Sequence, residues 1–245
     1  MSLFAIGDLH LSIGVGYVKS MDRFGGPWID HVGRLREDWD SRVSAEDIVV
    51  ILGDVSWGLK LEEAMPDLAW IDERPGRKLI LRGNHDLWWS SMAKMRDLFP
   101  SITFLRNDAV DTGEHIVFGS RGWICPGDSL FVEGEDRKIY ERELLRLRLA
   151  AGCAEELKTL AAAQGRFPKL IGVMHYPPTN DKKQPSGFTD IFSRAGAAAI
   201  LYGHLHGETA FYRGPSGVHY GMDCKLCSLD KLGGKLLRID TENEE

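Results

Sequence analysis

The chain has 245 residues, 43% hydrophobic and 27% charged, which is typical of a globular protein and excludes a disordered one. Thirty Lys and Arg against 36 Asp and Glu leave a net charge of −6, so we expect no extended nucleic-acid binding. Four scattered cysteines exclude a disulfide framework. Apolar runs of at most about eight residues are too short to cross a membrane. We therefore expect no signal peptide, no membrane segment and a cytoplasmic location.

The first hundred residues alternate between short apolar runs and amphipathic stretches. The apolar runs predict buried strands, and the three- and four-residue spacing between them predicts helices. This order predicts parallel strands joined by right-handed crossovers. The expected strands are Leu3–Ile6, Ile48–Leu52 and Leu79–Leu81, and the expected helices are Trp28–Val43 and Leu59–Ile71.

The remainder of the chain predicts a second set of strands around one long helix. That helix is expected at Asp136–Ala163, and short antiparallel strands are expected within Gly217–Ile239. No repeat or linker interrupts the chain, so we predict one domain over residues 1–245. The other expected strands are Ile102–Leu105, His115–Gly119, Trp123–Cys125, Leu170–Met174 and Ala197–Tyr202.

Polar residues follow five of these strands at their carboxyl ends, which is the edge where open α/β sheets bind ligands. Each segment alone is weak evidence, because an Asp or His after a strand is more often a surface turn. Their common position predicts one shared site. The segments are Gly7-Asp8-Leu9-His10, Gly53-Asp54, Arg82-Gly83-Asn84-His85-Asp86, His175 and Gly203-His204-Leu205-His206.

These side chains are typical ligands of divalent transition metals. Imidazole and carboxylate donors without thiolate suit divalent Mn, Fe, Zn, Ni or Co rather than a structural zinc. We take Mn as the favoured metal. Seven donors are too many for one ion and suit two ions that share a carboxylate. Such a pair would keep a net positive charge, attract phosphate and ionise bound water near neutral pH. The candidate ligands are Asp8, His10, Asp54, Asn84, His175, His204 and His206.

In this order the motifs resemble those of the calcineurin-like metallophosphoesterase superfamily, and they span residues 7–206. The resemblance implies a four-layer α/β/β/α sandwich, in which two mixed sheets are flanked by helices. It also implies that Asp54 bridges the two metals. One ion would be bound by Asp8, His10, Asp54 and His206, and the other by Asp54, Asn84, His175 and His204.

The resemblance further implies that His85 contacts the phosphate or protonates the leaving oxygen, with Asp86 holding its ring. The residues support this role independently, because His85 is not needed to complete either set of ligands and is free for general-acid work. Asp86 could raise its pKa and fix its tautomer. The alternative is that His85 only supports Asn84.

Several other residues leave two roles open. Arg121 follows a predicted strand and is our candidate for binding substrate phosphate, with an ion pair as the alternative. The long segment 11–27 could form part of a substrate-selecting cap. Four tryptophans near strand ends either line the site or pack beneath its loops, and these are Trp57, Trp88, Trp89 and Trp123.

The expected function is a metal-dependent hydrolase of a small phosphomonoester or phosphodiester, through attack by a metal-bridging hydroxide. His85 stands where the UDP-diacylglucosamine pyrophosphohydrolases of the family have Arg. Val55-Ser56-Trp57 and Asp86 differ from the family's protein phosphatases, and the chain resembles its small bacterial predicted phosphohydrolases. One alternative is a nucleotide pyrophosphatase or nuclease of the same superfamily. The other is a non-catalytic scaffold, which is disfavoured because no ligand is missing.

Overall fold

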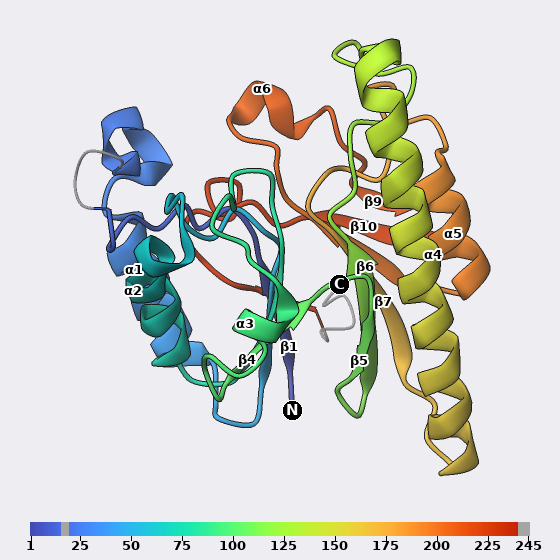
Figure 1. The fold of residues 1–245 in the computed structure, drawn as a ribbon, viewed down its shortest axis with the longest axis horizontal. Coiled ribbons are helices and arrows are strands. Elements are labelled where there is room, and N and C mark those ends of the chain that lie inside the picture. The colour runs from blue at the N-terminus through green and yellow to red at the C-terminus, as the bar shows by residue number, and fades with distance from the viewer. Residues whose placement is uncertain (16–19, 240–245) are drawn as a thin grey trace. The chain divides into compact units, whose positions relative to one another are not determined.

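The computed structural model describes residues 1–15 and 20–239 and divides the chain into two compact units (Figure 1). Unit 1 comprises Met1–Phe104 and Cys227–Glu245, and unit 2 comprises Leu105–Leu226. The expected cap segment 11–27 belongs to unit 1, and its residues 16–19 lie outside the described ranges. None of the helices in those ranges has the length and apolar character that a membrane crossing requires.

Unit 1 contains a five-stranded sheet in the order β11-β1-β2-β3-β4. Strands β1, β2 and β3 are parallel, with Leu3 beside Ile48 and Ile48 beside Arg77, while β11 runs antiparallel to β1. The apolar side chains of β1, β2 and β3 are almost fully buried, as expected for parallel strands covered on both faces. The strands are β1 (Leu3–Ile6), β2 (Ile48–Ile51), β3 (Arg77–Leu81), β4 (Ile102–Leu105) and β11 (Leu237–Arg238).

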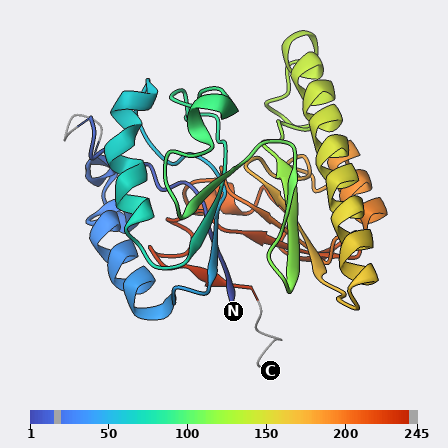
Figure 2. The same cartoon turned by 60° about the horizontal axis from the view of Figure 1, so that its bottom comes forward.

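Helices α1 (His31–Arg42) and α2 (Leu61–Asp72) lie side by side along this sheet, as Figure 2 shows. Helix α1 buries Leu35 and Trp39, and the indole of Trp39 donates to the Pro75 carbonyl oxygen at 3.0 Å. Both helices begin later than the periodicity predicts, and Trp28 lies in a separate 3₁₀ turn. The short elements of the unit are η2 (Met21–Phe24), η3 (Gly26–Trp28) and α3 (Met92–Met95).

Unit 2 contains a six-stranded sheet in the order β5-β6-β7-β8-β10-β9. The four strands β6, β7, β8 and β10 are parallel, and antiparallel β5 and β9 form the two edges. The strands are β5 (Ala109–Asp111), β6 (His115–Ser120), β7 (Lys169–Met174), β8 (Ala199–Tyr202), β9 (Gly217–His219) and β10 (Met222–Leu226).

The 31-residue helix α4 (Glu133–Ala163) and helix α5 (Gly187–Ala195) lie side by side in unit 2 (Figure 1). Leu144 and Leu147 of α4 and Phe188 and Phe192 of α5 belong to the same apolar core as Ile116 and Phe118 of β6. The short helix α6 (Glu208–Phe211) follows β8. The two mixed sheets, each with its own helices, confirm the predicted fold class.

One predicted strand is wrong, and β5 and α5 were not predicted, nor were the short elements η2, η3, α3 and α6. Residues 123–125 form no strand, because β6 ends at Ser120 and Gly122 turns the chain with a φ of 74°. Strand β5 has only three residues, too few for a visible alternation. Helix α5 begins with a capping box in which Ser186 and Thr189 exchange hydrogen bonds. That Ser-x-x-Thr spacing is a readable signal of a helix start.

Candidate metal and active site

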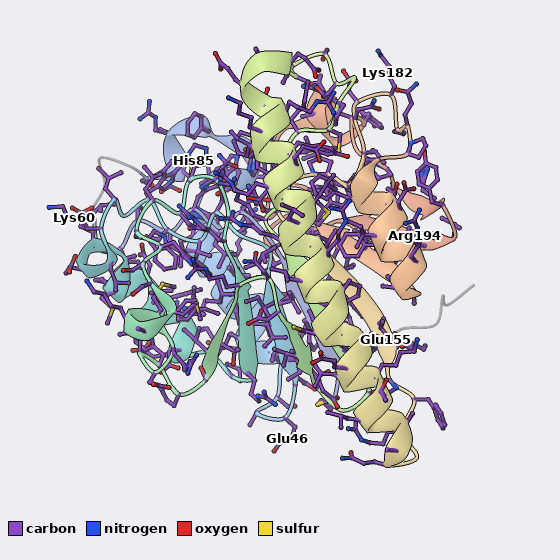
Figure 3. All side chains as sticks on the ribbon, turned by 45° about the vertical axis from the view of Figure 1, so that its right-hand side comes forward. Glu46, Lys60, His85, Glu155, Lys182 and Arg194 are labelled. Atoms are coloured by element: carbon purple, nitrogen blue, oxygen red, sulfur yellow. The ribbon has the colours of Figure 1, made fainter. Side chains whose placement is uncertain are left out.

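The N-terminal half-site consists of Asp8, His10, Asp54, Asn84 and His85, all in unit 1. These residues follow β1, β2 and β3, as the sequence predicts. Figure 3 shows His85 and Glu46 at opposite ends of the sheet, because Glu46 precedes β2 whereas His85 follows β3. The half-site therefore lies at the carboxyl edge of the parallel strands.

Backbone hydrogen bonds continue past the ends of β1 and β2 and hold the first two motifs together. The amide of Asp8 donates to the Gly53 carbonyl, and the amide of His10 donates to the Asp54 carbonyl, both at 2.9 Å. The Nε2 atom of His10 then lies 3.9 Å from Oδ2 of Asp54. Both side chains are almost fully buried, so a buried carboxylate and imidazole face each other.

The third motif, Arg82–Asp86 after β3, is joined to the first two motifs through Asp54. Its Oδ1 atom accepts a hydrogen bond from the backbone amide of His85 at 2.8 Å. Gly83 makes this approach possible, since a Cβ at position 83 would collide with the Asp54 carboxylate and backbone nitrogen. Asn84 is half-buried and the His85 ring is exposed, so the His85 ring is open to a solvent-borne substrate.

Asp86 does not hold the ring of His85, and this corrects the role we expected for it. Its fully buried carboxylate accepts backbone hydrogen bonds from Gly83, Asp54 and Val55 at 2.7 to 2.9 Å, and one from the Trp88 indole at 2.9 Å. Burial, followed by the charge of Asp54, raises the pKa of Asp86 to about 6. Asp86 is therefore a positioning residue that ties the second motif to the third.

The C-terminal half-site consists of His175, His204 and His206, all in unit 2. His175 follows β7 and is fully buried, whereas His204 and His206 follow β8 and are half-buried. The His204 Nδ1 and His175 Nε2 atoms lie 3.3 Å apart. Two nitrogens that bind one ion at about 2.0–2.1 Å are separated by about 3.0–3.4 Å. The observed spacing fits a pair of metal ligands.

The His175 segment is anchored by Arg121, but through its backbone. The carbonyl oxygen of Arg121 accepts hydrogen bonds from the amides of His175 and Tyr176, both at 3.1 Å. The guanidinium pairs with the buried carboxylate of Glu143 at 3.2 Å and lies over the Trp123 ring at 4.7 Å. The structure thus gives Arg121 the ion pair, which was the alternative to binding phosphate.

Four of the seven expected ligands share an unusual backbone conformation. Eight non-glycine residues within the described ranges have a positive φ, and four of them are expected ligands. Left-handed backbone is strained for such residues by roughly 1–3 kcal/mol and tends to occur where function requires it. The four are Asp8 (φ 62°), His10 (46°), Asp54 (51°) and His204 (74°).

The four tryptophans divide between the two roles left open by the sequence. Trp88 is buried, and Trp89 packs on Phe104 with ring centroids 5.4 Å apart, so this pair belongs to the core. Trp57 instead stacks on the His10 ring at 4.7 Å and lies 4.9 Å from the His85 ring. Trp123 is in unit 2, 5.0 Å from the Tyr176 ring.

The donor set fits the predicted metals, because the half-sites offer imidazoles and carboxylates, of which Asp8, His10, Asp54 and His175 are buried, and none of their donors is a thiolate. Residues 1–208, which include both half-sites, match the family model of the calcineurin-like phosphoesterases. The chain belongs to this family.

Two gene 66 proteins, from Mycobacterium phages D29 and L5, are 44% and 46% identical to this phosphoesterase over 79 residues. The match covers 32% of this chain and 37% of each phage protein. The chain therefore matches little more than a third of the length of these relatives.

Two solved structures resemble the phosphoesterase over nearly its whole length. A phosphopantetheinyl hydrolase (PptH) from Mycobacterium tuberculosis has a TM-score of 0.55 at 15% identity, over 100% of this chain and 97% of that one. TT1561 from Thermus thermophilus has a TM-score of 0.53 at 11% identity, over 97% of each chain. At these identities the similarity shows the fold alone.

Proposed function

We propose that this phosphoesterase uses two divalent metal ions, with Mn²⁺ favoured, to hydrolyse a small phosphomonoester or phosphodiester. The ligands would be the seven donors of the two half-sites, with Asp54 shared between the ions. We further propose that residues 1–245 act as one domain, because the family match runs through both units. A cytoplasmic location remains our prediction.

The observation that carries this proposal is the left-handed backbone at four of the seven donors. Strained conformations persist only where surrounding structure holds them, and here the holding bonds come from neighbouring motifs, as in His10 to Asp54. Gly adopts this conformation at the lowest cost, whereas Asp and His tolerate it better than most other residues. The use of Asp and His where Gly would be less strained supports a role for their side chains.

The charge of the donor set favours an anionic substrate. Asp8 and Asp54 are the two carboxylates among the seven donors, and Asn84 and the four histidines are neutral ligands. When bound, two divalent cations would supply a nucleophile from water at neutral pH and neutralise phosphate oxygens. Their charge of +4 exceeds that of the two carboxylates, so the site would attract a phosphate group.

His85 is the residue we propose as general acid for the leaving oxygen. Its backbone is fixed by the hydrogen bond to Asp54, while its ring is exposed beside Trp57. A fixed backbone with an accessible imidazole suits proton delivery to a departing alcohol. The ring contacts of Trp57 would restrict its orientation, which is the role that we first expected of Asp86.

The test is hydrolysis by metal-stripped protein to which single divalent ions are returned. We expect Mn²⁺ to restore turnover of p-nitrophenyl phosphate or of its bis ester. A nucleotide panel tests the pyrophosphatase alternative, and a phosphopantetheine ester belongs in the panel because of the name of the similar M. tuberculosis structure. Absence of turnover with every ion and ester would contradict an enzymatic role.

Metal content of variants tests the dinuclear arrangement. Asp54→Asn should lose both ions, because it alters the shared ligand, and His175→Ala should lose one. Asp97→Asn is the matched control, since Asp97 is an exposed carboxylate of unit 1 outside the half-site. Elemental analysis that finds two ions per chain in Asp54→Asn would refute the shared ligand.

A further inference from the structure

An apolar hollow of about 290 Å³ opens beside His85 within unit 1. Its walls include Met21 and Phe24 from η2, and Leu59 and Leu87 from the segments after β2 and β3. Phe24, Leu59 and Leu87 are 63%, 54% and 58% exposed. Large apolar side chains that gather around a concavity and remain exposed to water commonly mark a binding site.

Trp57 connects this hollow to the proposed chemistry. Its ring lines the hollow, stacks on the ring of the expected ligand His10 at 4.7 Å, and lies 4.9 Å from the ring of His85. His85 itself is part of the wall. A group bound in the hollow would therefore lie next to the imidazole that we propose as the acid for the leaving oxygen.

The charge of the wall restricts which group fits. Among the described residues that line the hollow there is no carboxylate, and Arg23 is the one Lys or Arg. The Arg23 guanidinium lies over the Phe24 ring at 5.3 Å, and no carboxylate in residues 1–15 and 20–239 forms an ion pair with it. The hollow thus favours a neutral apolar group on an anionic molecule and disfavours a cationic one.

We propose that the hollow binds the leaving alcohol of the substrate, and that this alcohol is an apolar aryl or short alkyl group. The inference rests on the proposed function, because it takes His85 as the acid for that alcohol. A volume near the lower end of the roughly 300–1,000 Å³ found for ligand pockets suits such a group better than a macromolecular segment. Specificity would then come from the alcohol rather than from the phosphate.

The test is a series of 4-alkylphenyl phosphates, from 4-methyl to 4-butyl, prepared as monoesters and as methyl diesters. The parent phenols have nearly equal acidity, so the series changes apolar area without changing reactivity. We expect kcat/KM to rise about two- to fourfold for each added methylene, as expected for its removal from water. A kcat/KM that is flat or falls along the series would overturn the proposal.

Two variants locate the binding of the alkyl chain. Leu59→Asn should reduce the rise per methylene, because it places an amide in the wall of the hollow. Leu160→Asn is the matched control: Leu160 lies on α4 of unit 2 and is 60% exposed, close to the 54% of Leu59. If both variants, with unchanged melting temperatures, keep the wild-type dependence on chain length, the alkyl group binds elsewhere and the inference is wrong.

A second readout separates this inference from the proposed function. Calorimetric titration with 4-alkylbenzyl phosphonates, which are not hydrolysed, measures binding whether or not any ester turns over. Affinity that rises with chain length in the wild type but not in Leu59→Asn supports the hollow even if hydrolysis fails. Affinity that does not depend on chain length overturns it even if hydrolysis succeeds.

Discussion

The carboxylates of Asp54 and Asp86, 32 residues apart, share one hydrogen-bonded circuit. Asp86 Oδ2 accepts from the backbone amide of Asp54 at 2.9 Å, and Asp54 Oδ1 accepts from the backbone amide of His85 at 2.8 Å. Asp86 thus holds the backbone of Asp54. Asp54 in turn holds the backbone of His85, the residue before Asp86. The proposed bridging ligand and the proposed acid are fixed by the same few bonds.

Asp86→Asn should disturb this circuit despite its equal size. The carboxylate is surrounded by N–H donors from Gly83, Asp54, Val55 and Trp88, and an amide replaces one acceptor with a donor that faces them. We expect a loss of about 2–4 kcal/mol in the free energy of unfolding, together with weaker metal binding. Urea unfolding and elemental analysis measure the two effects. An Asp86→Asn chain with wild-type stability and metal content would remove Asp86 from the site.

Gly83→Ala tests the close approach of the third motif to Asp54. Because the added methyl group would collide with the Asp54 carboxylate and backbone nitrogen, we expect metal binding to weaken and hydrolysis to fall by at least about tenfold, the change for 1.4 kcal/mol of lost binding. Metal titration and initial rates are the measurements.

The control for Gly83→Ala is Gly152→Ala on α4. A Cβ at Gly152 meets no atom within 4 Å, and Ala in a helix interior stabilises by about 0.5–1 kcal/mol relative to Gly. This variant should keep full activity and unfold at a slightly higher urea concentration. Equal activity of both variants would show that position 83 tolerates a side chain and that the steric argument fails.

The sequence predicts the carboxyl-edge position of the candidate ligands because it depends on local signals. A buried apolar run followed by Asp or His is visible within about ten residues, and β1, β2, β3, β7 and β8 all follow this pattern. The periodicity also predicts α4, which begins three residues earlier, at Glu133. In each case the determining residues are neighbours along the chain.

The parts that could not be predicted depend on contacts between distant segments. Asp86 is adjacent to His85 in the sequence. Yet its carboxylate accepts hydrogen bonds from the backbone amides of Val55 and Ser56, which lie 31 and 30 residues away. Arg121 pairs with Glu143, which lies 22 residues further on. No spacing rule distinguishes a carboxylate that faces an imidazole from one that faces backbone amides, because that choice depends on how the loops pack.

His85→Ala should retain its metal and lose rate in a way that depends on the leaving group. A general acid contributes about 10²- to 10⁴-fold when the departing alcohol is a poor leaving group, and much less when it is p-nitrophenol. Comparing p-nitrophenyl with simple alkyl esters therefore gives two different rate losses. His219→Ala is the control, since the ring of His219 is in unit 2 and bonds to the Ser216 carbonyl. Rate losses that are equal for the two classes of ester would exclude the acid role.

Lys78 gives the fold a pH dependence with a defined sign. Its side chain is fully buried on β3, and its Nζ atom donates to the carbonyl oxygens of Asp72 and Arg74 and to Ser101 Oγ. Burial lowers the pKa of Lys78 from 10.5 to about 8. Below pH 8 Lys78 is protonated in both the folded and the unfolded chain, and burial of its charge lowers the stability of the folded chain in full. Between about pH 8 and 10.5 the unfolded chain holds a proton that the folded chain has released, so stability rises with pH.

Lys78→Met isolates this contribution, because other titrating groups remain in both proteins and cancel in the difference. The variant should be less stable than the wild type at high pH, since the carbonyls of Asp72 and Arg74 lose their donor. The difference in the free energy of unfolding between wild type and variant should then narrow by on the order of 1–3 kcal/mol as the pH falls from 10.5 to 8, because Lys78 of the folded wild type becomes charged over this range. Urea unfolding at intervals across this range measures it. A difference that is constant, or that widens toward pH 8, would mean that the buried ammonium costs the folded state nothing.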